Sequence, residues 1–378
     1  MLHSGFTTCP MRVVGRLLGG LVVGLLLGVT AARAEEEKVL NVYNWSDYIA
    51  EDTIKNFEKE FGIKVRYDTF DSNEVLNAKL VAGKSGYDIV VPSSSWAQQQ
   101  IGSGLLRKLD KAQLPNLKHL DPDIQSKIAS FDPGNQYLVN WLWGYTTIGI
   151  NTAKVKAALG ADPMPTNIWE LLFNPKYVSK LKGCGVSVLD AASEVLPAAL
   201  HFIGKSPFSK NAADYQDAST LLKSIRPYIT LFSLSGYIND MASGSVCLAL
   251  GWNGDINIAR RRAIEGKTGQ DITALIPKTG GILFFDMMAI PSDAPHPDNA
   301  HLFINYILRP EVGASLTNKV FYANPNKSSR SLIKPEVAHN PTVFPSSSDV
   351  AGMIAPEVLA NDVRRMMSRV YTSFKSGL

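Results

Sequence analysis

The stretch with the clearest chemical potential is residues 44–48, which read Asn-Trp-Ser-Asp-Tyr and directly follow an apolar run at residues 39–43. A ring beside a carboxylate suits an ammonium ligand, because the ring face attracts a cation and the acid supplies the counter-charge. In open α/β sheets, ligands bind beyond the carboxyl ends of the strands, where this stretch would lie. The alternative is structural, with Ser46 or Asp47 capping a helix and Trp45 in the core.

Two later stretches repeat the combination of ring and acid. Residues 252–255 read Trp-Asn-Gly-Asp, and residues 284–286 read Phe-Phe-Asp. Asp286 stands among Ile, Leu, Phe and Met, where a carboxylate is costly to bury without a partner. No basic residue lies near it in the sequence. We therefore expect an incoming cation to pair with it, with a carboxylate held by backbone groups as the alternative.

Other chemistries leave no pattern in the chain. The six histidines are scattered without zinc-ligand spacing, and there is no Walker loop or dinucleotide-binding glycine fingerprint. No nucleophile has a visible base beside it. Paired carboxylates and tryptophans also occur in glycosidases and sugar-binding proteins, which form the alternative class. Three or four acids each lie beside an aromatic, more than one acid/base pair requires, so we expect a binding protein without catalysis, metal or cofactor.

The elements that would position these groups alternate between strand and helix. Residues 39–43, 63–67 and 87–91 have strand patterns, with helices expected at residues 52–61 and 72–82 between them. This order implies right-handed crossovers and a parallel sheet, whose strands all end at one edge. The ring-and-acid stretch after the first strand would lie at that edge.

The rest of the chain predicts a second domain. A chain of 378 residues exceeds one core of ordinary size. Residues 138–151 look like a buried strand crossing between domains, and therefore a candidate hinge. Alternation resumes with helices that include residues 166–173, and strands at 272–277 and 282–291 are expected to return to the first domain. The basic run at residues 260–262 is interpreted as a solvated helix face.

The first 34 residues have the features of a secretory signal peptide. Arg12 and Arg16 precede an apolar run too short to span a bilayer comfortably, and small residues follow, with the cut expected after Ala34. Removing three arginines and no acids from 38 basic and 34 acidic residues leaves a net charge of +1. A near-neutral mature chain gives no argument for nucleic acid or anionic membrane as a partner. We expect export to the periplasm.

Two cysteines remain after this segment, Cys184 and Cys247. In an exported protein they are expected to form one disulfide. Closing a loop of that length stabilises the fold by roughly 4 kcal/mol in the chain-entropy treatment. Two buried thiols are the alternative.

Six stretches together resemble the signature segments of the bacterial polyamine-binding periplasmic proteins, and most of all of the putrescine-binding members. They are residues 44–48, 70–74, 88–93, 237–240, 251–255 and 321–324, in the same order over essentially the whole mature chain. The resemblance implies an α/β, two-lobed periplasmic solute-binding protein of type II. Each lobe would be a mostly parallel sheet flanked by helices, and hinge strands would join the lobes. We expect lobe 1 to comprise residues 35–143 with 278–322, and lobe 2 residues 144–277 with 323–378.

The resemblance also implies a ligand-binding set. The aromatic walls would be Trp45, Trp252, Phe284 and Tyr322, the acids Asp47, Glu194, Asp255 and Asp286, and the remaining contacts Ser46, Tyr48, Ser93, Ser95 and Trp96. Cys184 and Cys247 match the family's disulfide positions. The ligand would be a polyamine, and the partner the membrane permease of an ABC importer, served by a monomer.

Three positions bear on which polyamine is preferred. Trp96 stands where Phe is expected in the putrescine pattern, and Leu234 where a polar residue is expected. Ala191 lacks the extra carboxylate of spermidine-preferring relatives. The last feature favours a diamine.

Overall fold

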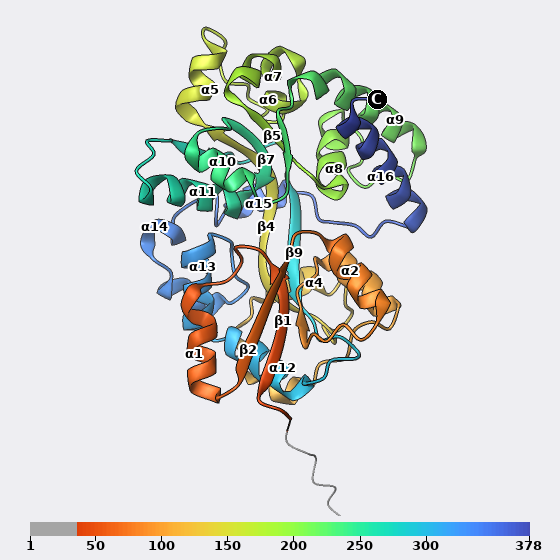
Figure 1. Ribbon diagram of the computed structural model, residues 1–378, viewed down its shortest axis with the longest axis vertical. Coiled ribbons are helices and arrows are strands. Elements are labelled where there is room, and N and C mark those ends of the chain that lie inside the picture. Colours follow the sequence, from red (N-terminus) through yellow and green to blue (C-terminus); the bar gives the residue numbers. More distant parts are fainter. Residues whose placement is uncertain (1–35) are drawn as a thin grey trace, which may run out of the picture. The chain divides into compact units, whose positions relative to one another are not determined.

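The computed structural model describes residues 36–378, so the expected signal peptide and its cleavage site lie outside the described residues. Within residues 36–378, helices and strands gather into two groups, each built on a sheet. The strands β4 (Val139–Asn151) and β9 (Ile282–Met288) run between the two groups (Figure 1). This arrangement has the α/β organisation expected from the sequence.

The first sheet consists of three parallel strands in the order β2-β1-β3, and its alternation with helices is confirmed. Its elements are β1 (Val39–Trp45), α1 (Glu51–Phe61), β2 (Lys64–Phe70), α2 (Asn73–Ala82), β3 (Ile89–Val90) and α3 (Ser94–Gly102). The helix α1 buries Phe57 and ends at Gly62, whose φ of 67° is left-handed and suits glycine. The hydroxyl of Ser72 accepts a hydrogen bond from the Val75 amide, so Ser72, where the helix was expected to begin, caps α2.

The second sheet is mixed and not mostly parallel. Its order is β6-β5-β7-β4-β8, with β5 (Val186–Leu189), β6 (Leu231–Ser233), β7 (Leu248–Trp252) and β8 (Ile272–Ala274). The pairs β5-β6 and β5-β7 are parallel, whereas β4 runs antiparallel to β7, β8 and β9. The long strand β4 arrives from the first group of elements, and its direction makes the sheet mixed.

The two strands expected to return to the first domain behave differently. The strand β8 pairs with Gly149–Asn151 of β4 and stays in the second sheet, so that expectation is wrong for β8. The strand β9 pairs with β4 along its other half, and beyond its end Ala289 bridges to Val90 of β3. It therefore connects both sheets, as expected.

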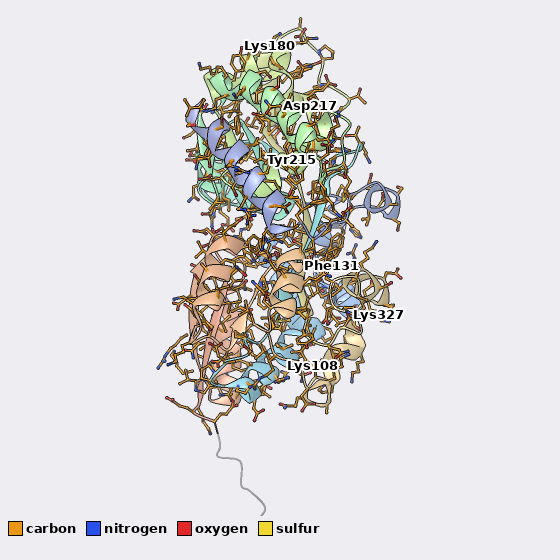
Figure 2. All side chains as sticks on the ribbon, turned by 90° about the vertical axis from the view of Figure 1, so that its right-hand side faces the viewer. Lys108, Phe131, Lys180, Tyr215, Asp217 and Lys327 are labelled. Atoms are coloured by element: carbon orange, nitrogen blue, oxygen red, sulfur yellow. A yellow bond between two sulfur atoms is a disulfide. The ribbon has the colours of Figure 1, made fainter. Side chains whose placement is uncertain are left out.

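The remaining helices flank the two sheets. They are α4 (Pro122–Ile128), α5 (Thr152–Leu159), α6 (Glu170–Phe173), α7 (Pro175–Leu181), α8 (Ala192–Phe202), α9 (Ala212–Ile225), α10 (Tyr237–Ser243), α11 (Asn253–Glu265), α12 (Pro297–Ile307), α13 (Pro310–Val320), α14 (Pro335–Ala338), α15 (Ser347–Ala351) and α16 (Asn361–Ser376). The helix expected at residues 166–173 is only α6, because the Asn167 side chain accepts from the Trp169 amide and forms a local turn instead. Figure 2 shows buried Tyr215 in one group of elements and buried Phe131 in the other.

The C-terminal elements pack on both groups. The helix α16 lies against α8 and α9, beside the second sheet (Figure 1). The 3-10 turn Lys327–Leu332 packs against α13 instead, and Ile333, Val337 and Val343 share a small core with Ala314 of that helix. The chain therefore passes from the first group to the second between this small core and α16.

The expected disulfide is present. Cys184 and Cys247 are joined, with their Cα atoms 5.5 Å apart, and the bond ties the start of β5 to the start of β7. No helix within residues 36–378 is long and apolar enough to span a membrane.

Candidate ligand-binding site

A cavity of about 550 Å³ lies where the first sheet, the second sheet and β9 meet. It is lined by Trp45, Ser46, Tyr48, Asp71, Asn73, Ser93, Glu194, Leu234, Ser235, Trp252, Asp255, Phe284, Asp286 and Tyr322. Ten of the thirteen residues expected in the ligand-binding set are among these. The two sheets and the crossing strand thus bring together residues that are far apart in the sequence.

Asp255 stands in the first turn of α11, directly after β7, and is 9% exposed. The Tyr322 hydroxyl donates to its Oδ1 at 2.6 Å, and the Tyr237 hydroxyl donates to its Oδ2 at 3.0 Å. Each tyrosine oxygen also accepts a backbone N–H, from Asp255 and from Trp252, at 3.1 Å. The tyrosine protons must therefore point at the carboxylate, which favours its charged form.

Asp286 occupies the middle of β9 and is 5% exposed. The Ser93 hydroxyl donates to its Oδ1 at 2.7 Å, and the Tyr48 hydroxyl donates to its Oδ2 at 2.9 Å. Asn73 fixes Ser93, because its amide oxygen accepts the Ser93 N–H and its amide nitrogen donates to the Ser93 hydroxyl. Hydroxyl groups therefore hold this carboxylate, and the alternative, in which backbone groups hold it, is not observed.

Burial dominates the ionisation of both acids. It raises the pKa of Asp255 to about 6 and the pKa of Asp286 to about 7, against the lowering effect of the hydroxyl donors. The charges of Glu194 and Asp255 raise the pKa of Asp286 further. Within residues 36–378, no ion pair involves either acid. The cavity therefore holds carboxylates without a counter-charge of their own.

Glu194 is the third acid of the cavity and stands in the first turn of α8. The Thr146 hydroxyl donates to its Oε2 at 2.5 Å, and burial raises its pKa. The helix N-terminus favours its negative charge. The hydroxyl of Thr146 thus favours the ionised form of Glu194, whereas burial, the larger effect, opposes it.

Aromatic rings form the walls between these acids. The rings of Trp45 and Trp252 meet edge to face with centroids 6.5 Å apart, and Tyr322 makes similar contacts with Tyr48 and Phe284 at 5.0 and 6.0 Å. The Trp45 indole is fixed by donation to the Val91 carbonyl at 2.8 Å. Ring faces and carboxylates together can attract and desolvate an organic cation.

Two glycines let the walls approach closely. A Cβ at Gly254 would collide with the ring of Tyr322, and one at Gly144 would meet Phe284 Cζ at 2.8 Å. Gly254 lies between Trp252 and Asp255 in the expected ring-and-acid stretch. Its absent side chain is what allows the Tyr322 hydroxyl to reach Asp255.

Asp47 is not brought to the cavity. Its φ is 56°, and its Oδ1 pairs with Arg262 Nη2 of α11 at 2.7 Å on the surface. Arg261 donates to the Lys319 carbonyl and its guanidinium lies over the Phe321 ring. The expectation of Asp47 as a cavity acid is therefore wrong. The expected solvated face of residues 260–262 describes only Arg260, which is exposed, because Arg261 and Arg262 have partners on other elements.

Ser95 and Trp96 line an adjoining chamber of about 900 Å³ and not the cavity itself. They follow Ser93 on α3, and only Ser93 faces Asp286. The two spaces share Asn73, Ser93, Glu194 and Phe284. The chamber and the cavity are therefore neighbouring spaces with a common wall.

A family model described as the bacterial extracellular solute-binding protein matches residues 52–345. The chain belongs to this family. It is 46% identical over 362 residues to the putrescine-binding periplasmic protein PotF of Escherichia coli (strain K12), covering 95% of this chain and 98% of PotF. It is 45% identical over 360 residues to the putrescine-binding periplasmic protein SpuD of Pseudomonas aeruginosa (strain UCBPP-PA14), covering 95% and 96%.

A solved structure supports the fold of this solute-binding protein. The putative spermidine/putrescine ABC transporter from Listeria monocytogenes superposes with a TM-score of 0.80 at 32% identity, over 90% of this chain and 99% of that chain. The two-lobed type II periplasmic architecture expected from the sequence is thereby established.

Several cavity residues of this solute-binding protein were missed by sequence reasoning. Asp71 accepts from the Ser46 hydroxyl at 2.9 Å, and Asn73 holds Ser93, although both lie in the quoted stretch at residues 70–74. Tyr237 and Thr146 orient the acids from other elements. The position of Asp71 and Asn73 just after β2 could have indicated their role from the sequence. The roles of Tyr237 and Thr146 depend on contacts with residues distant in the sequence.

The raised pKa of Asp286 predicts a pH-dependent effect of Asp286→Asn on the empty protein. Because the folded pKa of about 7 exceeds the ordinary aspartate value of 3.8, ionisation destabilises the native state increasingly as pH rises between these values. Asparagine removes this cost. The gain in unfolding free energy should be about 3 kcal/mol larger at pH 8 than at pH 5, by urea denaturation. The exposed Asp123→Asn is the control, and an equal gain at both pH values would contradict burial as the cause.

Proposed function

We propose that this protein captures a linear diamine, putrescine in preference to other polyamines, in the periplasm and delivers it to the membrane permease of an ABC importer. The observation that carries the proposal is the pair of buried carboxylates, Asp255 and Asp286, each held by two hydroxyl donors and neither ion-paired. A dicationic ligand would supply both missing charges. The names of PotF and SpuD, which describe putrescine-binding periplasmic proteins, support the same ligand class.

In this proposal the two aspartates anchor the two ammonium groups of the ligand. Each carboxylate oxygen already accepts one hydroxyl proton and keeps a lone pair for an ammonium donor. Trp45, Trp252 and Phe284 would enclose the methylene chain and present ring faces to its ends. Glu194 would be a secondary contact, held ready by Thr146.

A glycosidase is the second class that the sequence left open. A carboxyl with a raised pKa could act as a general acid, and tryptophans line many sugar sites. Here, hydroxyl donors engage both oxygens of each aspartate, which suits a carboxylate that accepts hydrogen bonds from a cation better than an acid that must deliver its proton to a substrate. The names of the related proteins describe binding proteins and not enzymes. The binding function is therefore the better supported.

Export and lobe movement complete the proposal. Residues 1–34 would be removed as a signal peptide after Ala34, and the exported protein would act as a monomer. Lobe 1 would comprise residues 35–143 with 278–322, and lobe 2 residues 144–277 with 323–378, hinged on β4 and β9. Residues 327–343 pack on α13, which is part of lobe 1, and this packing favours assigning them to lobe 1 instead of lobe 2.

Titration calorimetry against putrescine, cadaverine, spermidine and a neutral sugar tests the proposed function. Putrescine should bind with a stoichiometry of one, and its affinity should fall as pH drops below about 7. The reason is that Asp255 and Asp286, with pKa values of about 6 and about 7, must lose protons to pair with the ligand. Sugar binding without amine binding, or release of a product from a glycoside, would overturn the proposal.

Asp255→Asn and Asp286→Asn should each weaken putrescine binding by several kcal/mol, about 2–5, as when one partner of a buried charge pair is lost. Calorimetry of each variant, with urea denaturation to confirm folding, measures the effect. Asp123→Asn removes an acid from the exposed surface of α4 and should leave affinity unchanged. Near-normal affinity in either cavity variant, together with easier unfolding, would make that aspartate structural.

Closure of the lobes predicts that putrescine compacts the protein, because both sheets contribute groups to one cavity. Small-angle X-ray scattering should give a smaller radius of gyration with saturating putrescine than without it. The Asp286→Asn variant at the same putrescine concentration provides the comparison, and should stay expanded. Identical profiles for the wild-type protein with and without bound ligand would exclude closure.

A further inference from the structure

The chamber beside the cavity contains a cation of the protein's own. Besides the four residues shared with the cavity, this space of about 900 Å³ is lined by Trp96 of α3, Arg364 of α16 and two further acids, Glu74 and Glu357. The Arg364 guanidinium carbon lies 4.2 Å from the centroid of the Trp96 ring. One face of that ring is thereby occupied.

The hydrogen bonds of Arg364 leave its charge largely uncompensated. Its Nε donates to the Leu359 carbonyl at 3.1 Å, and its Nη1 has no hydrogen-bond partner. Within residues 36–378 no carboxylate forms an ion pair with it. Besides the Leu359 carbonyl, the Trp96 ring is therefore the favourable partner of this guanidinium.

The chamber combines an aromatic ring with acids, as the cavity does, but it already contains a cation, the guanidinium of Arg364. In the cavity, ring faces and acids surround space open to a ligand. In the chamber, the Trp96 ring, the acids Glu74 and Glu357 and the cation Arg364 line the same space. A ligand longer than a diamine would extend from the cavity past Glu194 and Phe284, and its next ammonium would meet the guanidinium at short range. Like charges at such a site repel, and the ring cannot hold both cations.

We propose that Arg364 is a specificity-determining residue that occupies the position a third ammonium would take, so that the protein selects diamines over triamines. The inference rests on the proposed function and adds to it the residue that limits ligand length. It also gives Trp96 a role, since the ring holds Arg364 in place and does not contact the diamine.

Arg364→Ala tests the inference in the full mature protein, with putrescine and spermidine as probes. Removing the side chain frees the Trp96 ring and leaves Glu74 and Glu357 to attract the added ammonium. The ratio of spermidine affinity to putrescine affinity, measured by calorimetry, should rise about tenfold, as expected for one cation–π contact. We compare the ratio because a general loss of lobe closure would lower both affinities together and leave their ratio unchanged.

Three further variants complete the design. Arg365→Ala removes the same charge from an exposed position of α16 and should leave the ratio unchanged. Arg364→Lys keeps a cation in the chamber and should keep the ratio near the wild-type value. Arg364→Met retains the aliphatic stem and replaces the alanine variant if that variant does not fold. It should raise the ratio in the same direction.

The outcomes separate this inference from the proposed function. A wild-type protein that binds neither amine overturns the proposed function itself. A wild-type protein that binds putrescine, with an unchanged ratio in folded Arg364→Ala or Arg364→Met, overturns only the role of Arg364. An equal rise in Arg365→Ala would also overturn it, because the effect would then reflect the net charge of α16 and not the chamber.

Discussion

The structure depends on burying carboxylates that have no ion-pair partner of their own within residues 36–378. A buried carboxylate without a partner loses several kcal/mol of hydration, and an empty cavity cannot return it through an ion pair. Hydroxyl groups that donate hydrogen bonds to the carboxylates offset part of this free-energy cost. Tyr237 and Tyr322 each accept a backbone N–H and must donate to Asp255. The remaining cost is what a cationic ligand can relieve, so binding strength and the instability of the empty site have the same origin.

The strand β4 sets the distance between the acids. Its C-terminal half pairs with β7, which leads into Asp255, and its N-terminal half pairs with β9, which carries Asp286. Gly144 lies between these halves, where any side chain would strike Phe284 and the Asn253 amide. The strand β4 is therefore the candidate hinge, and it also determines the separation of Asp255 and Asp286 and the close approach of the aromatic walls. Changes along β4 are expected to affect ligand recognition without touching a ligand.

Local patterns predicted the parts of this arrangement that local physics decides. The period of apolar residues located the alternating elements of the first sheet, and Ser72 caps α2 as its position indicated. The ring-and-acid stretches located Asp255 and Asp286 because each follows or interrupts an apolar strand. Asp47 was misjudged because its partner, Arg262, lies 215 residues away in sequence. Nothing in the local composition distinguishes an acid that faces a cavity from one that meets a distant arginine.

The separation of charges explains why the cavity stays anionic in a chain with a nearly balanced total charge. Arg262 lies seven residues after Asp255 on α11, and its charge lowers the pKa of Asp255 only as a minor effect. Arg262 is held outside by Asp47 and by the Asn239 side chain at 2.9 Å. Arg364 is likewise held in the outer chamber by Trp96 and the Leu359 carbonyl. Each arginine near the site thus has partners that draw it away from the buried aspartates. In the proposed function, the ligand and no side chain supplies the counter-charge of these aspartates, whose pKa values are raised by burial.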